Sequence, residues 1–291
     1  MESRWYKLLI YVSLVFLIIV LFRSNYLQIP KIHSLWWLLA SFLCVIGGFL
    51  ANALALQRVL MTANIDIHFS RSVAMMGLNI FGKYIPGKIW VIMGRALYIA
   101  EKCNHPVADV SFVLLKGQLI SVWCGLAFGM CGLVVIDALR SVSWLGLGIF
   151  AVFTLTLFSQ KIQSMTLGAV NHIFRKTYHL PEIDLMASLA LTPWFMYGWV
   201  LWGCGFAFMA QSMLAQVMPL TTVFGFPLAG TLGIVLLFAP GGIGIRESII
   251  AGYLVLVNVP VSDAVTVSAI SRLWFLLGEA VFFGMGYLAG R

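Results

Sequence analysis

The sequence has little charge. Only 10% of its 291 residues are charged and only ten are acidic, whereas a soluble domain usually has about 25% charged residues. The apolar residues, 62% of the chain, stand in long runs, and the mean hydropathy is +1.00. The alternating segments of about ten residues that are typical of a membrane β-barrel are missing. Because the runs reach the roughly 20 residues that cross a bilayer as a helix, the sequence predicts an all-α polytopic membrane protein.

The sequence also lacks the residue groups that hold metals or perform catalysis. Its five cysteines form no C-x-x-C pair, and its five histidines stand in loops without ligand spacing. No paired carboxylates and no Ser/His/Asp set stand out. We therefore expect no disulfide framework, metal, cofactor or enzymatic activity. The net charge of +8 is better explained by basic cytoplasmic loops than by a nucleic-acid partner.

The apolar runs predict about six full transmembrane helices and two re-entrant helical hairpins. The six runs taken as full spans are 7–22, 35–56, 108–136, 142–158, 188–214 and 264–289. The runs 72–100 and 221–258 are interrupted by Pro86-Gly87 and by Pro240-Gly241-Gly242. A Pro-Gly step breaks a helix and lets the backbone reverse. Paired short segments of this kind indicate a transport site.

The distribution of basic residues predicts the topology. If both interrupted runs leave the membrane on the side they entered, most Lys and Arg residues of the loops lie in the cytoplasm, together with both termini. The same assignment of sides predicts that residues 188–291 are an inverted copy of residues 35–136. Residues 1–34 are then an anchor helix, and residues 137–187 are a linker helix and cytoplasmic loop. We expect a single transmembrane domain in a plasma membrane, either the bacterial inner membrane or the archaeal cell membrane.

Eight charged residues stand inside the apolar runs. Four ionised side chains facing lipid would cost about 10–14 kcal/mol, at roughly 2.5–3.5 kcal/mol each, so these residues should face one another, a wet cavity or the interface. Arg272 and Glu279 are seven residues apart and share a helix face. Six of the eight are basic, and helix N-termini after each break add donors, which suits an anionic headgroup such as a phosphate. The candidate headgroup-binding residues are Lys83, Pro86, Gly87, Lys88, Arg95, Lys116, Pro240, Gly241, Gly242, Arg246, Glu247, Arg272 and Glu279. Alternatively, Lys83 and Lys88 reach the cytoplasmic interface, while Arg272 and Glu279 only tie helices together.

The stretches 79–95 and 238–247, the second of which reads FAPGGIGIRE, resemble the lysylphosphatidylglycerol synthase transmembrane-region family, also described as flippase-like. The resemblance covers roughly residues 10–290. It implies movement of a lipid between leaflets: aminoacylated phosphatidylglycerol in the best-known members, and a link to lipid-linked glycan or isoprenoid-lipid pathways in others. It also implies that Pro86, Gly87 and Arg95 match a first motif, and Pro240, Gly241, Gly242, Arg246 and Glu247 a second. Without the soluble transferase domain of the full synthases, we expect no lysylphosphatidylglycerol synthesis.

The leading expectation is a flippase or transporter for an anionic phospholipid or a polyprenyl-phosphate-linked sugar. Arg246, Arg95 and Lys88 would hold the phosphate, while Glu247 and Glu279 balance charge or couple protons. A membrane transferase that acts on a lipid phosphate is one alternative. An accessory scaffold for a membrane glycosyltransferase, and hence an envelope-biosynthesis enzyme as partner, is another.

Overall fold

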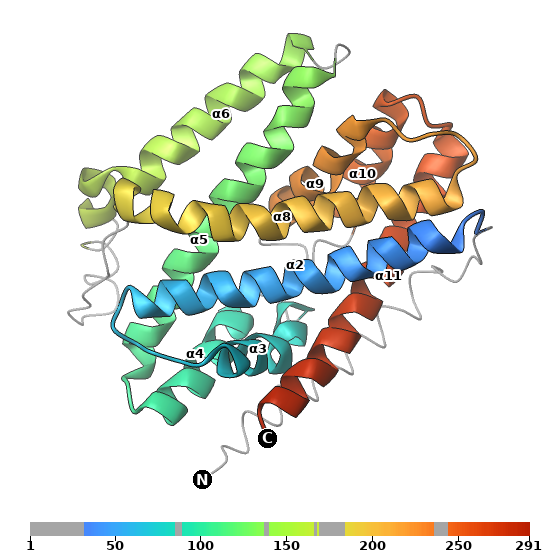
Figure 1. The fold of residues 1–291 in the computed structure, drawn as a ribbon. Helices are drawn as coiled ribbons and strands as arrows, with labels where there is room; N and C mark the ends of the chain where they lie inside the picture. Colours follow the sequence, from blue (N-terminus) through green and yellow to red (C-terminus); the bar gives the residue numbers. More distant parts are fainter. Residues whose placement is uncertain (1–31, 85–88, 137–139, 166–167, 169–183, 236–243) are drawn as a thin grey trace.

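A computed structural model describes residues 32–84, 89–136, 140–165, 168, 184–235 and 244–291 (Figure 1). Throughout these ranges the regular structure is helical, which confirms the prediction of an all-α protein. The first predicted span, 7–22, and both Pro-Gly steps lie outside the described residues.

Four helices are long and apolar enough to cross a membrane. They are α2 (Leu35–Met61), α5 (Val107–Val135), α8 (Leu185–Met213) and α11 (Val261–Ala289). At 27 to 29 residues each is about 40 Å long, which exceeds the roughly 30 Å of a hydrocarbon core. The predicted span 142–158 is α6 (Arg140–Phe158), a shorter apolar helix. The structure therefore supports four of the predicted full spans by length and composition.

Both interrupted runs are divided into separate helices. The first contains α3 (Phe69–Leu78), the 3₁₀ turn η1 (Ile80–Tyr84) and α4 (Ile89–Cys103). The second contains the 3₁₀ turn η3 (Leu220–Phe224), α9 (Gly225–Val235) and α10 (Ile245–Leu256). In each run the two α-helices contact each other, as they could not if they continued along one axis.

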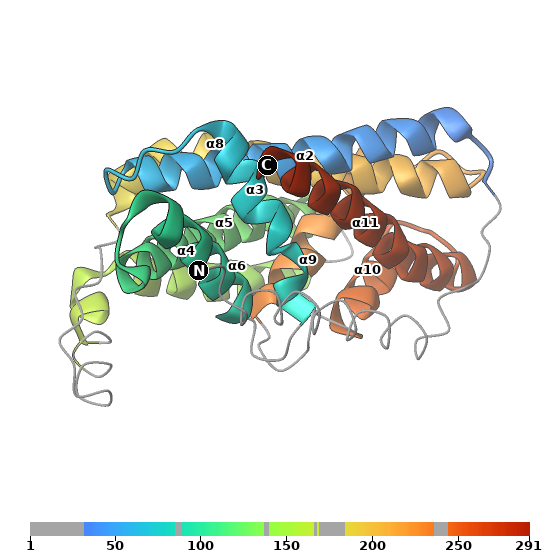
Figure 2. The ribbon, with the colours of Figure 1, turned by 90° about the horizontal axis from the view of Figure 1, so that it is seen from below.

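Helices α2 and α8 lie side by side and antiparallel (Figures 1 and 2). At one end the backbone N–H of His33 donates to the carbonyl of Ser212 over 2.8 Å. At the other end the guanidinium of Arg58 lies 5.1 Å from the ring centroid of Trp194. These opposite ends fix the antiparallel direction of the pair.

The contacts of the first half have counterparts in the second. Helix α11, the last helix of the second half, packs on α3, and α5, the last helix of the first half, packs on α9. Likewise α4 packs on α5, and α10 packs on α11. This is the set of contacts that two similar units related by a two-fold axis would make.

A short sequence repeat accompanies this arrangement. Residues 104–109 read NHPVAD and residues 258–263 read NVPVSD, 154 positions later. In both copies the Asn has a left-handed backbone, with φ of 55° at Asn104 and 67° at Asn258, and the following Pro is the N-cap of a 29-residue helix. Pro86 and Pro240 are also 154 residues apart. The loops that enter α5 and α11 are therefore alike in sequence and in backbone conformation.

Apolar and charged side chains are distributed as in a membrane protein. Large apolar side chains point outward: Trp36 is 82% exposed and Trp144 76%. Charged side chains lie inside, with Arg272 4% and Glu279 0% exposed. A soluble protein would bury the first kind and expose the second, so the surroundings of this fold are apolar.

Candidate functional site

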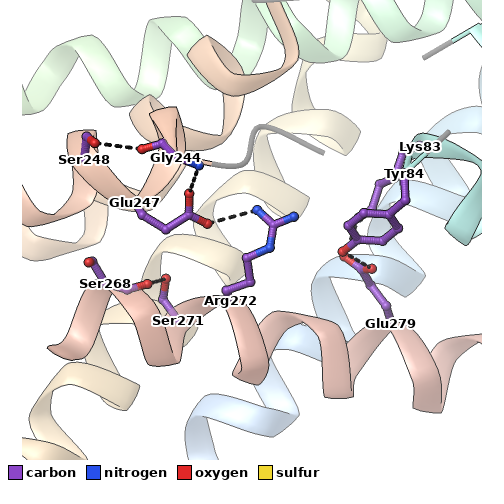
Figure 3. A network of polar contacts seen from close by, with 9 residues as sticks. All are labelled: Lys83, Tyr84, Gly244, Glu247, Ser248, Ser268, Ser271, Arg272 and Glu279. Atoms are coloured by element: carbon purple, nitrogen blue, oxygen red, sulfur yellow. Dashed lines mark hydrogen bonds and ion pairs between the residues drawn. The ribbon is translucent and has the colours of Figure 1, made fainter. Parts of the chain in front are cut away.

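The candidate site is organised by α11, which carries Arg272 and Glu279 on one face. They are separated by two helical turns, or about 10 Å along the axis. They are too far apart to pair with each other, and each instead binds a residue from a different interrupted run (Figure 3). The site therefore joins both interrupted runs to one continuous helix.

Residues of η1 surround Glu279. Lys83 Nζ forms an ion pair with Glu279 Oε1, and the Tyr84 hydroxyl donates to Glu279 Oε2 over 3.0 Å. Both carboxylate oxygens thus have a donor, as a fully buried carboxylate requires. Lys83 is only partly buried, since 31% of its side chain is exposed. Lys83 thus pairs with Glu279 while part of its side chain stays exposed.

Residues at the start of α10 surround Arg272. Its Nη1 atom donates to Glu247 Oε1 over 2.9 Å, while Glu247 Oε2 accepts the backbone N–H of Gly244 over 2.7 Å. Gly244 precedes the helix with φ of +83°, a conformation that side chains other than glycine rarely adopt. The carboxylate therefore both caps α10 and fixes the guanidinium of α11 in place.

Arg246 provides donors that no described residue uses. Its guanidinium lies 4.4 Å from the ring centroid of Phe226 and 4.9 Å from that of Phe275. Its Nε and Nη2 atoms are buried and have no hydrogen-bond partner among the described residues. These two N–H groups lie along one edge of the guanidinium, the edge that binds two oxygens of a carboxylate or phosphate. The rings hold the planar group in position and leave that edge for an anion.

The charges of this cluster do not cancel. Lys83, Arg246 and Arg272 are cationic, whereas Glu247 and Glu279 are anionic, which leaves one positive charge among these five side chains. An unbalanced charge in a low-dielectric site is costly. A bound anion would lie against this positive charge and supply acceptors for Arg246.

The remaining predicted residues are distributed as follows. Lys116 on α5 lies near Asp184, the N-cap of α8. Arg95 on α4 is 8% exposed, and its buried Nε has no hydrogen-bond partner among the described residues. Six predicted residues lie outside the described ranges: Pro86, Gly87, Lys88, Pro240, Gly241 and Gly242.

Four contributors to the site were not among the predicted residues: Gly244, Tyr84, Phe226 and Phe275. Tyr84 could have been suspected, since its hydroxyl stands beside Lys83 at the break in an apolar run. Phe226 and Phe275 are ordinary members of apolar runs, and nothing in their spacing distinguishes them. Their role follows only from the packing of α9 and α11 around Arg246.

The protein has buried ion pairs, an apolar exterior and four helices long enough to span a membrane. These features define a multi-pass helical membrane protein. The chain belongs to the family described as the lysylphosphatidylglycerol synthase TM region, whose model matches residues 4–277. Searches of the curated proteins and of the solved structures gave no match.

Proposed function

We propose that the protein moves an anionic lipid, either a phospholipid or a polyprenyl-phosphate-linked sugar, between the leaflets of a plasma membrane. The observation that carries this proposal is Arg246, whose buried Nε and Nη2 donors have no partner among the described residues. Such donors are costly to bury unless a ligand completes them. The family match supports a role in lipid metabolism or lipid movement.

The two interrupted runs would provide the moving parts. We propose that each forms a re-entrant hairpin and that residues 188–291 are an inverted copy of residues 35–136. The paired helix contacts and the repeated Asn-x-Pro-Val-x-Asp loops support this arrangement. In transporters built from inverted repeats, the site lies where the repeats meet, and rocking of one repeat against the other exposes it alternately to each side. Here both runs meet on α11.

The ion pairs explain how an anionic headgroup could be accepted in the membrane. The headgroup phosphate would bind the free edge of Arg246, beside Lys83 and Arg272, while the acyl or prenyl chains stay in lipid. Both termini would lie in the cytoplasm, and an envelope-biosynthesis enzyme that makes or uses the lipid would be the partner.

A leaflet-exchange assay tests this function. Purified protein is reconstituted into liposomes with fluorescent phosphatidylglycerol, and the outer-leaflet label is quenched over time. The wild type should expose inner-leaflet label far faster than protein-free liposomes do, and Arg246→Ala should lose at least 90% of this rate. Arg58→Ala is the matched control, because Arg58 also stacks on an aromatic ring but lies outside the cluster, and it should keep the wild-type rate. Exchange by Arg246→Ala at the wild-type rate would refute the role of Arg246.

A further inference from the structure

Glu279 has an unusual position among the charges of the site. It is 0% exposed and depends on Lys83 as its cation, whereas 31% of the Lys83 side chain is exposed. The lysine is therefore the partner that can move, because it is a charge on a flexible four-carbon stem. The Glu279 carboxylate is fully buried and cannot follow the lysine.

Lys83 and the guanidinium of Arg246 both approach the ring of Phe275. The Nζ atom of Lys83 is 5.1 Å from the centroid of this ring, which Arg246 approaches to 4.9 Å. Lys83 is within electrostatic range of Arg246 and of Arg272. An anion on the free edge of Arg246 would thus attract Lys83 toward itself and away from Glu279.

A buried carboxylate that loses its cation cannot remain charged at low cost, and it neutralises itself by taking up a proton. Four charged or titratable groups interact electrostatically with Glu279. They are Lys83 and Tyr84 of η1, Arg272 of α11 and Arg246 of α10. Glu247 of α10 is already paired with Arg272, and α2 places the apolar Val45 and Phe49 against the neighbouring Gly278. Lys83 is the cation that pairs with Glu279 among the described residues. Tyr84 is neutral, Arg272 donates from Nη1 to Glu247, and Arg246 would be held by the anion.

We infer that Glu279 is a proton-binding site coupled to the headgroup site, so that one anionic headgroup and one proton cross together. This inference rests on the proposed function. The balance of charge is simple: a headgroup with one negative charge binds at Arg246, Lys83 moves to it, and a proton from water binds Glu279. The transported pair is electrically neutral. By linkage, a proton on Glu279 strengthens anion binding by the same factor that the anion strengthens proton binding.

The test imposes the two components of a proton gradient separately on proteoliposomes that contain fluorescent phosphatidylglycerol, which carries one negative charge. A pH difference is applied with the membrane potential clamped at zero by valinomycin and equal potassium. The lipid should then accumulate in the leaflet on the alkaline side, toward a limit of about tenfold per pH unit. A membrane potential at equal pH should leave the distribution unchanged.

Two variants assign the effect to its residue. Glu279→Gln imitates the protonated carboxyl, so the lipid should cross without a proton: the pH response should disappear, and a membrane potential of 100 mV should shift the distribution toward a limit of roughly fiftyfold. Glu101→Gln, a control at an exposed position on α4, should behave as the wild type does.

The outcomes are separable. Wild-type exchange that follows the membrane potential and ignores the pH difference overturns proton coupling, whatever the stability of the variants. An unchanged pH response in an active Glu279→Gln protein overturns the assignment to Glu279. No wild-type exchange under either gradient overturns the proposed function itself.

Discussion

Arg272 and Glu279 stand two turns apart on the same face of α11 and pair in different directions. The first binds Glu247 of α10, and the second binds Lys83 of η1. Each pair joins a break in an apolar run to a continuous helix. Movement of either run relative to α11 must therefore break or exchange one ion pair, which links the charges of the site to its conformation.

The pair of Arg272 and Glu247 should be strongly coupled in stability. Arg272→Met leaves a buried carboxylate without its cation, which should cost about 3–5 kcal/mol. The double variant Glu247→Gln, Arg272→Met removes both charges, and Gln can still accept the Gly244 N–H. In thermal unfolding in detergent, the melting temperature of the double variant should be well above that of Arg272→Met. Losses that simply add would show that the two side chains act independently.

The contact between α3 and α11 depends on two glycines. A Cβ at Gly286 would lie 2.9 Å from the Cα of Gly77, a backbone atom that cannot turn aside. Gly286→Ala should therefore separate the helices and cost about 1–3 kcal/mol, seen as a lower melting temperature. Gly284→Ala on the same helix meets nothing within 4 Å and should be neutral or slightly stabilising. Equal effects of the two changes would contradict this packing.

The turn into α10 requires glycine at position 244. With φ of +83°, Gly244→Ala should cost about 1–3 kcal/mol in backbone strain and displace the N–H that Glu247 accepts. Gly252→Ala lies within α10 with open space around it and should stabilise by up to about 1 kcal/mol. Thermal unfolding of both variants measures the difference. A Gly244→Ala protein as stable as the wild type would show that the turn relaxes.

The repeated loops provide a test of the inverted topology. Ala108 and Ser262 are both exposed, are 154 positions apart and follow the two Pro N-caps. In a cysteine-free background, Ala108→Cys should react with an impermeant maleimide from the cytoplasmic side only, and Ser262→Cys from the outside only. Labelling of both cysteines from one side would rule out the inverted repeat.

The sequence was informative where its signals are local. The all-α fold, the family and the interruption of runs 72–100 and 221–258 were predicted correctly, because long apolar runs, Pro-Gly steps and the FAPGGIGIRE stretch are local signals. The shared face of Arg272 and Glu279 also follows from spacing alone. Their partners do not, since pairing depends on which run packs on α11. The repeat at 104–109 and 258–263 was visible in the sequence, but its meaning becomes clear only with the matched left-handed Asn residues.

If the free edge of Arg246 binds an anionic headgroup, the purified protein should retain an anionic lipid, and lipid retention measures this binding most directly. Protein purified in detergent with phosphatidylglycerol is examined by native mass spectrometry, next to Arg246→Lys, which keeps the charge but lacks the two-donor edge, and Arg58→Ala as control. One phosphatidylglycerol should be retained on the wild type and on Arg58→Ala, and at least tenfold less on Arg246→Lys. Equal retention by the wild type and Arg246→Lys would contradict headgroup binding at this edge.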